Sequence, residues 1–171
     1  MASTTSADRP LARPGLRFVL GHPARLIAFG FGSGLSPQAP GTMGTLATFP
    51  LFWALQPHLS HAVLLAVGAL AFLVGIAACS RTGRELGVED HPGLVVDEMA
   101  AFWLVLCLLP PGRGWEAAAF LLFRLLDIFK PPPIRQVERA VRGGLGVMLD
   151  DLLAAFGTLL LLALYRRIAH G

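Results

Sequence analysis

One long stretch without acidic or basic charge, residues 46–80, most strongly constrains the fold of this chain. Within it, residues 62–79 form an unbroken apolar run, AVLLAVGALAFLVGIAAC, and His58 and His61 are the ionisable members of the 46–80 stretch. A helix needs about 20 predominantly apolar residues to cross a bilayer. Residues 62–79 are therefore the clearest candidate for a membrane-spanning helix.

The composition of the whole chain also indicates a membrane protein. Hydrophobic residues make up 54% of the 171 residues and charged residues only 15%, and the mean hydropathy is +0.63. This balance is far from that of an ordinary soluble domain. Two shorter apolar runs, residues 99–112 and 152–165, are either core helices or spans completed by tilting. Two to four membrane segments are expected.

The fold class predicted is all-α, a compact helical bundle that is membrane-embedded or membrane-associated. Lipid offers backbone groups no solvent partner, and strand signals are few. Prolines at 110–111 and 131–133 end helices because proline cannot donate a backbone hydrogen bond. The expected helices are residues 46–55, 62–86, 97–109, 115–128, 133–142 and 148–168.

One helical domain is expected over residues 21–168, preceded by a disordered basic tail at residues 1–20. The tail is rich in Ser, Thr, Arg and Pro and has no apolar core of a secretory signal. Arginines crowd the N-terminal side, and Arg166 and Arg167 follow the last apolar run. The positive-inside bias therefore predicts both termini in the cytoplasm.

A Gly/Pro/Thr-rich loop near the N-terminus, residues 32–45, is a candidate anion site. Its glycines allow close backbone approach, and Ser36, Thr42 and Thr45 offer hydroxyl donors. A helix beginning near Thr45 would direct backbone N–H groups at an anion. Spacing alone favours the alternative of a membrane-surface turn, since no Walker-type phosphate loop is present.

Five of the eleven acidic residues lie beside or inside apolar segments. They are Asp97, Glu98, Asp127, Asp150 and Asp151. Removing an ionised carboxylate from water costs several kcal/mol, on the order of 3 or more, unless it is paired, metal-bound or protonated. A divalent cation with hard oxygen preference, most naturally Mg²⁺, would satisfy all of them.

Cationic residues accompany these acids, and each acidic segment also has a simpler explanation. Lys130 and Asp127 are three residues apart and share a helix face, which favours an ion pair or a paired metal and phosphate site. Arg124 and Arg135 are further candidate anion ligands. Helix capping would explain Asp97 or the Asp150–Asp151 pair separately, but one metal site explains all three segments together.

Four segments in order resemble the phosphatidylglycerophosphatase A family. They are residues 32–46 (GSGLSPQAPGTMGTL), 96–98 (VDE), 123–131 (FRLLDIFKP) and 143–151 (GGLGVMLDD). The resemblance covers about residues 26–160. It implies a bacterial inner (cytoplasmic) membrane enzyme, a Mg²⁺-dependent phosphoric monoester hydrolase of phospholipid biosynthesis. Its substrate would be phosphatidylglycerophosphate, its products phosphatidylglycerol and phosphate, and its surroundings membrane lipids, with no nucleic acid partner.

The site hypothesis follows from the acids and the resemblance together. Mg²⁺ is assigned to Asp97, Glu98, Asp127, Asp150 and Asp151, with Glu98 alternatively the base that orients water. These five and Lys130 form the catalytic set, and substrate binding is assigned to Ser36, Thr42, Thr45, Arg124, Lys130 and Arg135. Direct attack by water is favoured, and an aspartyl-phosphate intermediate stays open. Two alternatives also stay open: a phosphatase of another lipid phosphate, and a non-catalytic membrane protein with a carboxylate ion path.

Overall fold

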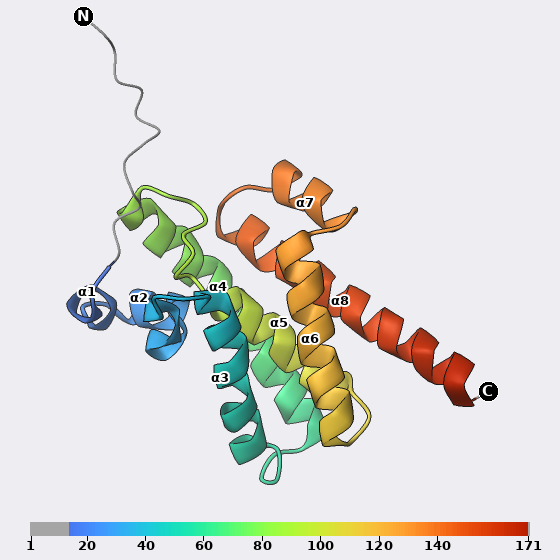
Figure 1. The fold of residues 1–171 in the computed structure, drawn as a ribbon. Helices are drawn as coiled ribbons and strands as arrows, with labels where there is room; N and C mark the ends of the chain where they lie inside the picture. The colour runs from blue at the N-terminus through green and yellow to red at the C-terminus, as the bar shows by residue number, and fades with distance from the viewer. Residues whose placement is uncertain (1–13, 171) are drawn as a thin grey trace, which may run out of the picture.

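The computed structural model describes residues 14–170, and these fold as an all-α bundle without a β-strand, as predicted (Figure 1). The elements are α1 (Leu16–Leu20), α2 (Pro23–Ala28), the 3-10 segment η2 (Gly30–Leu35), α3 (Pro40–Leu55), α4 (His61–Leu86), α5 (Val96–Leu108), α6 (Arg113–Phe129), α7 (Ile134–Ala140) and α8 (Gly143–His170).

Helix α5 is the centre of the bundle. It packs against α3, α4 and α8, and ten of its thirteen residues are buried. Phe102 and Val105 are fully inaccessible and join Phe123 of α6 in the main core. The apolar run at residues 99–112 is therefore explained by burial within the protein, which was one of the two alternatives that the sequence left open.

Small residues allow the long helices to approach closely. A side chain at Gly68 of α4 would meet Trp103 and Leu104 of α5, and one at Gly75 would meet Met148 of α8. Trp103 Nε1 also donates a 2.8 Å hydrogen bond across this interface to the carbonyl oxygen of Leu64. Helix packing through small residues here occurs within the chain.

Two predicted boundaries were wrong. Helix α3 begins at Pro40 instead of residue 46. Proline suits the first helical position because the backbone N–H that it lacks would have no partner within the helix there. Helix α8 begins at Gly143 instead of residue 148, so the glycine cluster lies in its first turns. Gly144 packs directly against the backbone of α4, where only glycine fits, and this contact explains the glycine without a loop.

The predicted disordered tail is partly ordered. Residues 16–20 form α1, Val19 of this helix is fully buried, and the Arg25 guanidinium of α2 lies 4.3 Å from the centre of the Phe18 ring. Residues 1–13 of that predicted tail lie outside the described residues. The N-terminal helices are thus part of the domain.

Two helices in the described chain, α4 and residues 143–169 of α8, are long and apolar enough to cross a membrane. Helix α6 is too short for that test. Near its C-terminal end Arg124 and Asp127 line a cavity, whereas several large apolar side chains of the same helix are exposed. These exposed side chains are Leu121, Leu125, Ile128 and Phe129. Exposed apolar side chains of this kind match lipid better than water.

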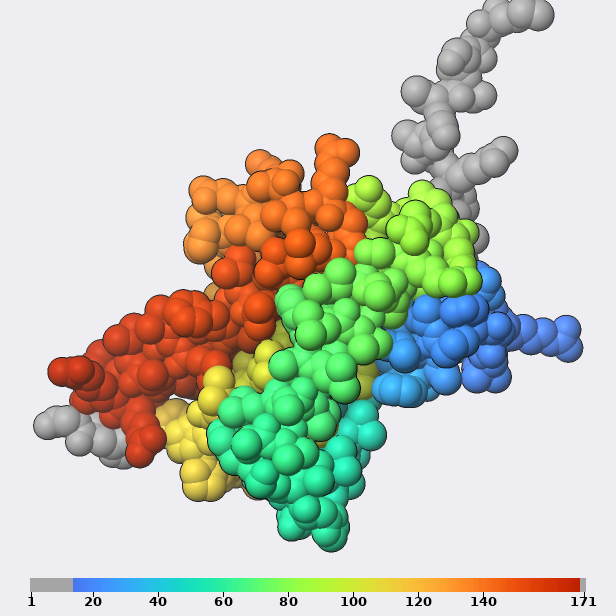
Figure 2. All heavy atoms as spheres, turned by 180° about the vertical axis from the view of Figure 1, so that it is seen from behind, coloured from blue at the N-terminus to red at the C-terminus, as the bar shows by residue number. Residues whose placement is uncertain are grey.

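The first and last described helices lie at different ends of the bundle. The N-terminal helices pack near the C-terminal end of α4, where Arg25 pairs with Glu85, and α8 starts near Ser80 of the same region. Helix α8 then runs away from this region and extends beyond the other helices (Figures 1 and 2). The C-terminal end of α8 is consequently remote from α1 and α2.

Candidate active site

All five predicted carboxylates line one cavity of about 250 Å³. Its walls come from the N-terminal ends of α3 and α5, the C-terminal end of α6, the first third of α8, and the loop between α4 and α5. The lining residues are Ala39, Pro40, Gly41, Asp90, Pro92, Leu94, Asp97, Glu98, Arg124, Asp127, Lys130, Asp150 and Asp151. We call the end of the bundle that holds this cavity the acidic end.

Three carboxylates form a tight group inside the cavity. One oxygen from each of Asp97, Glu98 and Asp151 lies within 4.8 Å of the others. Asp97 and Asp151 are almost fully buried, and Glu98 Oε2 is buried without a hydrogen-bond partner among the described residues. An orphaned carboxylate oxygen next to two further carboxylates requires a proton or a cation. These residues therefore fit a hard divalent metal ion.

Electrostatics within the group favour the same conclusion. Burial, followed by the charge of neighbouring Glu98, raises the pKa of Asp97 well above its usual range. Burial also raises the pKa of Glu98 to about 7. Carboxyl groups with raised pKa values stay protonated unless a nearby positive charge stabilises their ionised form. A divalent cation would supply that charge.

The start of α5 allows two adjacent acids to reach one point. Asp97 and Glu98 are the second and third residues of α5, and Val95 is the N-cap. The N-cap prediction for Asp97 is therefore wrong, although the first turn does favour negative charge. The capping explanation for Asp150 and Asp151 is wrong too, because both lie two turns inside α8.

Arg124 connects two of the acids. Its Nη1 atom lies 2.6 Å from Asp127 Oδ2 and 3.6 Å from Glu98 Oε1. All three side chains are close to nine-tenths buried, so the attraction is weakly screened by solvent. The partner of Asp127 on α6 is thus Arg124, so the ion-pair alternative for Asp127 and Lys130 is wrong, and their metal and phosphate roles stay predictions.

Lys130 ends α6 in the left-handed conformation, with φ of 44°. Its ammonium group contacts Asp150 of α8 and, at 2.8 Å, Glu138 of α7. Burial opposes the charged form, but the hydrogen bonds to Asp150 and Glu138 outweigh it and raise the pKa of Lys130. A permanent positive charge therefore borders the cavity.

The N-terminal end of α3 forms another wall of the cavity. The first backbone N–H groups of a helix have no partner within the helix, and Pro40 and Gly41 of this turn line the cavity. A side chain at Gly41 would overlap the Glu98 carboxylate and approach Arg124. A helix N-terminus does border the cavity, but it begins at Pro40 and not near Thr45, and its binding of an anion stays a prediction.

Four predicted substrate ligands do not line this cavity. Ser36 lines a neighbouring cavity of about 400 Å³, and its hydroxyl donates to the Gln38 carbonyl oxygen. Thr45 is fully buried and donates to the carbonyl oxygen of Gly41. Thr42 is half-buried one residue beyond Gly41, and exposed Arg135 donates to the carbonyl oxygen of Phe129. Their binding roles stay predictions.

Sequence reasoning missed Asp90, Gly41 and Glu138. Asp90 lies in a polar loop rather than an apolar segment, so the rule that found the other acids passed over it. Glu138 is recognisable only through its contact with Lys130. His91, in the loop before α5, is buried, and its Nδ1 atom accepts a hydrogen bond from Gly93 N.

Known proteins resemble this chain over most of its length. Residues 26–166 match the family described as phosphatidylglycerophosphatase A. A protein of that name from Escherichia coli K12 is 45% identical over 139 residues, which are 81% of this chain and 80% of the relative. Its namesake from Haemophilus influenzae is 44% identical over 135 residues, covering 78% of this chain and 83% of the relative.

A further relative carries a different name. A Bacteroides thetaiotaomicron protein provisionally named a phosphatidylinositol-3-phosphatase is 41% identical over 148 residues, covering 82% of this chain and 92% of the relative. No solved structure matches the chain significantly.

Proposed function

The chain belongs to the phosphatidylglycerophosphatase A family, and from this premise we propose that it hydrolyses phosphatidylglycerophosphate to phosphatidylglycerol and phosphate in a Mg²⁺-dependent reaction. Membership makes the protein an enzyme, a phosphoric monoester hydrolase. The proposed reaction is a step of phospholipid biosynthesis. The alternative of a non-catalytic membrane protein with a carboxylate ion path is not favoured, because the chain belongs to a family of phosphatases.

The observation that carries the proposal is the convergence of the Asp97, Glu98 and Asp151 oxygens beside the Arg124 and Lys130 cations. Oxygen ligands of this type suit Mg²⁺, which prefers carboxylates and substrate phosphates. Two cations and a helix N-terminus border the same space, and these groups suit a phosphate dianion. An ion path would not require this pairing of opposite charges.

The residues of the acidic cavity take different roles in the proposed hydrolysis. Asp97, Glu98 and Asp151 would hold Mg²⁺, which neutralises charge on the phosphoryl oxygens when bound. Arg124, Lys130 and the N-terminal end of α3 orient the phosphate. A water oxygen bonds to phosphorus and gives up a proton to Asp127, the bond from phosphorus to the glycerol oxygen breaks, and that oxygen takes up a proton in turn. Asp127, held by Arg124, is a base close to the phosphate.

The fold accounts for a lipid substrate. We place α4 and α8 across the bacterial inner membrane, with the exposed apolar side chains of α6 towards lipid. The acidic end carries most of the arginines, and the positive-inside bias places that end in the cytoplasm. Those arginines are Arg17, Arg25, Arg81, Arg84, Arg135, Arg139 and Arg142.

The predicted cytoplasmic C-terminus does not fit this arrangement. Asp150 and Asp151 lie near the start of α8, and Arg166 and Arg167 lie near its end. A membrane-crossing α8 carries Arg166 and Arg167 to the side opposite the acidic end. We therefore propose that the N-terminal helices and the site share the cytoplasmic side and that the C-terminal end of α8 lies across the membrane.

A second candidate substrate is another lipid phosphate monoester. The Bacteroides relative is named for activity on an inositol lipid, and the acidic cavity binds the phosphate rather than the remainder of the headgroup in our proposal. Parallel assays on phosphatidylglycerophosphate, phosphatidylinositol 3-phosphate and phosphatidic acid separate the candidates by their kcat/KM values.

The direct test is phosphate release from phosphatidylglycerophosphate in mixed micelles, with and without Mg²⁺. The parent protein is compared with Asp97→Asn and Asp127→Asn, and Glu116→Gln, at the opposite end of the bundle, is the matched control. Metal-dependent release that only the two site variants abolish supports the proposal. No release by folded parent protein supplied with Mg²⁺ would overturn it.

A further inference from the structure

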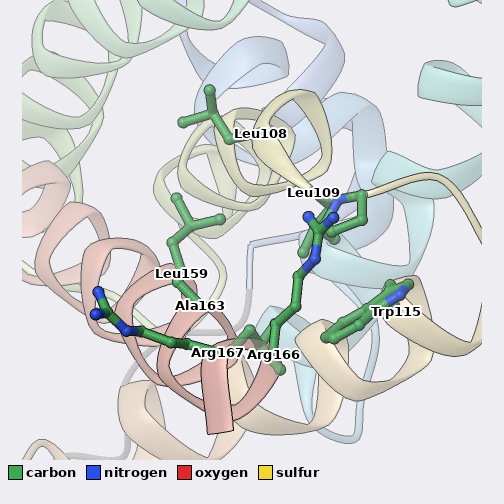
Figure 3. A pocket seen from close by; sticks show the side chains of 9 residues that line it. Leu108, Leu109, Trp115, Leu159, Ala163, Arg166 and Arg167 are labelled. Atoms are coloured by element: carbon green, nitrogen blue, oxygen red, sulfur yellow. The ribbon is translucent and has the colours of Figure 1, made fainter. Parts of the chain in front are cut away.

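A second cavity, of about 550 Å³, lies at the end of the bundle opposite the acidic end (Figure 3). The C-terminal ends of α5 and α8 and the start of α6 form it. Its walls are mainly apolar: Leu108, Leu109, Pro110, Trp115, Leu159, Leu162 and Ala163, with Arg166 and Arg167 at one side. None of these residues lines the acidic cavity.

The two cavities lie too far apart to be one binding site. Asp151 and Arg166 are on the same helix, and their separation along its axis is roughly 22 Å at about 1.5 Å per residue. Such a distance is comparable with the hydrocarbon thickness of a bilayer, about 30 Å. The second cavity therefore lies near the opposite membrane surface if α8 crosses the membrane.

Positive charge at this cavity has no acidic partner within residues 14–170. Arg166 and Arg167 are exposed, and neither side chain forms an ion pair or hydrogen bond with any residue that the structure describes. Figure 3 shows the Arg166 side chain extending towards Leu109 and the Arg167 side chain extending the other way. The guanidinium groups are available to an anion from two directions.

Aromatic residues mark the same level of the bundle. The rings of Trp115 and Tyr165 make an edge contact with centroids 6.2 Å apart, directly beside the cavity wall. Trp53 lies under the Arg113 guanidinium, 3.7 Å from its ring centre. Tryptophan and tyrosine concentrate at the boundary between lipid tails and headgroups. This level therefore has the composition of a headgroup interface.

We propose that this cavity binds an anionic phospholipid, with an acyl chain against the leucines, the headgroup phosphate on Arg166, and Arg167 adding positive charge at the same side of the cavity. Charge complementarity and the apolar walls together select this occupant. A soluble anion would leave the leucine-lined space unfilled, and a zwitterionic lipid would set its own cation against the arginines. The assignment is independent of the chemistry at the acidic end.

The test uses Trp115 as a reporter in the full chain. Trp53 is replaced by Phe, and Trp103 is buried in the core, so Trp115 is the tryptophan that borders the cavity. The protein in mixed micelles is titrated with phosphatidylglycerol or phosphatidylcholine carrying brominated acyl chains, which quench tryptophan at short range. We expect half-maximal quenching by phosphatidylglycerol at a mole fraction about 100-fold lower, roughly tenfold for each arginine.

Matched variants assign the effect to the cavity. Replacing both arginines, Arg166→Ala with Arg167→Ala, should bring the two lipids to within about threefold of each other. Arg84→Ala, an exposed arginine at the acidic end, should keep the preference. Ala163→Phe narrows the cavity without changing charge and should reduce quenching by both lipids.

Two results would overturn the assignment. One is equal quenching by the two lipids in the parent, which would mean ordinary solvation by lipid. The other is an unchanged preference in the double arginine variant, which would place the anion elsewhere. Since the readout is quenching of Trp115, loss of phosphatase activity or a different substrate would leave the test unaffected.

Discussion

Arg124 Nη1 lies 2.6 Å from Asp127 Oδ2, and both side chains line the acidic cavity from a helix that also exposes several large apolar side chains. In a soluble bundle the charged pair would be expected outside and the leucines inside. Here the C-terminal half of α6 buries Arg124 and Asp127, whereas Leu121, Leu125, Ile128 and Phe129 are exposed. This one helix therefore links the proposed chemistry to the proposed membrane location.

Replacing Asp151 with Asn tests the metal group. The substitution keeps the side-chain shape but removes one of the three clustered carboxylates. We expect Mg²⁺ affinity to fall by at least tenfold and phosphate release to fall by about 100-fold or more, because one charged ligand is lost. Calorimetric Mg²⁺ titration and the phosphate assay measure the two effects. Wild-type Mg²⁺ affinity in this variant would remove Asp151 from the metal site.

Arg124 should act through its charge and its forked geometry. Arg124→Ala should lower kcat/KM by about 100- to 1,000-fold, the range for losing one preorganised donor to developing charge. Arg124→Lys should recover part of that loss, since lysine keeps the charge without the planar fork. Steady-state kinetics on both variants tests this order. Equal activities of the two variants would contradict a role for geometry.

Gly41 should tolerate no side chain. The Cβ of Gly41→Ala would overlap the Glu98 carboxylate, so we expect weaker Mg²⁺ binding and activity at least tenfold lower. Gly114→Ala is the control, because a side chain at this α6 position meets nothing within 4 Å and alanine favours helix. Activity assays on both compare the sites. A fully active Gly41→Ala protein would show that Glu98 can move without consequence.

Mg²⁺ affinity should rise with pH. Burial raises the pKa of Glu98 to about 7, so Glu98 is largely protonated at pH 6 and largely ionised at pH 8. The ion binds the ionised form, and affinity should increase by up to about tenfold per pH unit below that pKa and level off above it. Calorimetric titrations at several pH values check the slope, and Glu98→Gln should flatten it. Equal affinity of the parent at pH 6 and 8 would contradict the prediction.

Gly144 should be required for α8 to contact α4. A Cβ at this position would overlap the Ile76 carbonyl oxygen and crowd Ser80, and backbone atoms cannot move aside as a flexible side chain can. Gly144→Ala should destabilise the fold by about 1–3 kcal/mol, the usual cost of overpacking. Thermal unfolding in detergent measures it against Leu145→Ala, an exposed neighbour. An unchanged unfolding temperature would mean that α8 shifts freely.

Much of the fold was predictable because hydrophobic runs and prolines act locally. The run at residues 62–79 predicted α4, and the prolines at 110–111 and 131–133 predicted the ends of α5 and α6. The helix boundaries that were predicted wrongly depend on contacts with residues that are distant in sequence. The start of α8 is helical where the sequence shows a glycine cluster, because those glycines fit against another helix.

The sequence by itself determined which groups carry the chemistry. A carboxylate in an apolar segment is costly whatever the fold, so Asp97, Glu98 and Asp151 stand out from their sequence neighbours alone. Tertiary structure decided the pairing, because partners such as Arg124 and Glu98, or Lys130 and Asp150, are distant in sequence and meet only when helices pack. It also decided that Gly41 borders Glu98 and that Arg166 lies a helix length from the site.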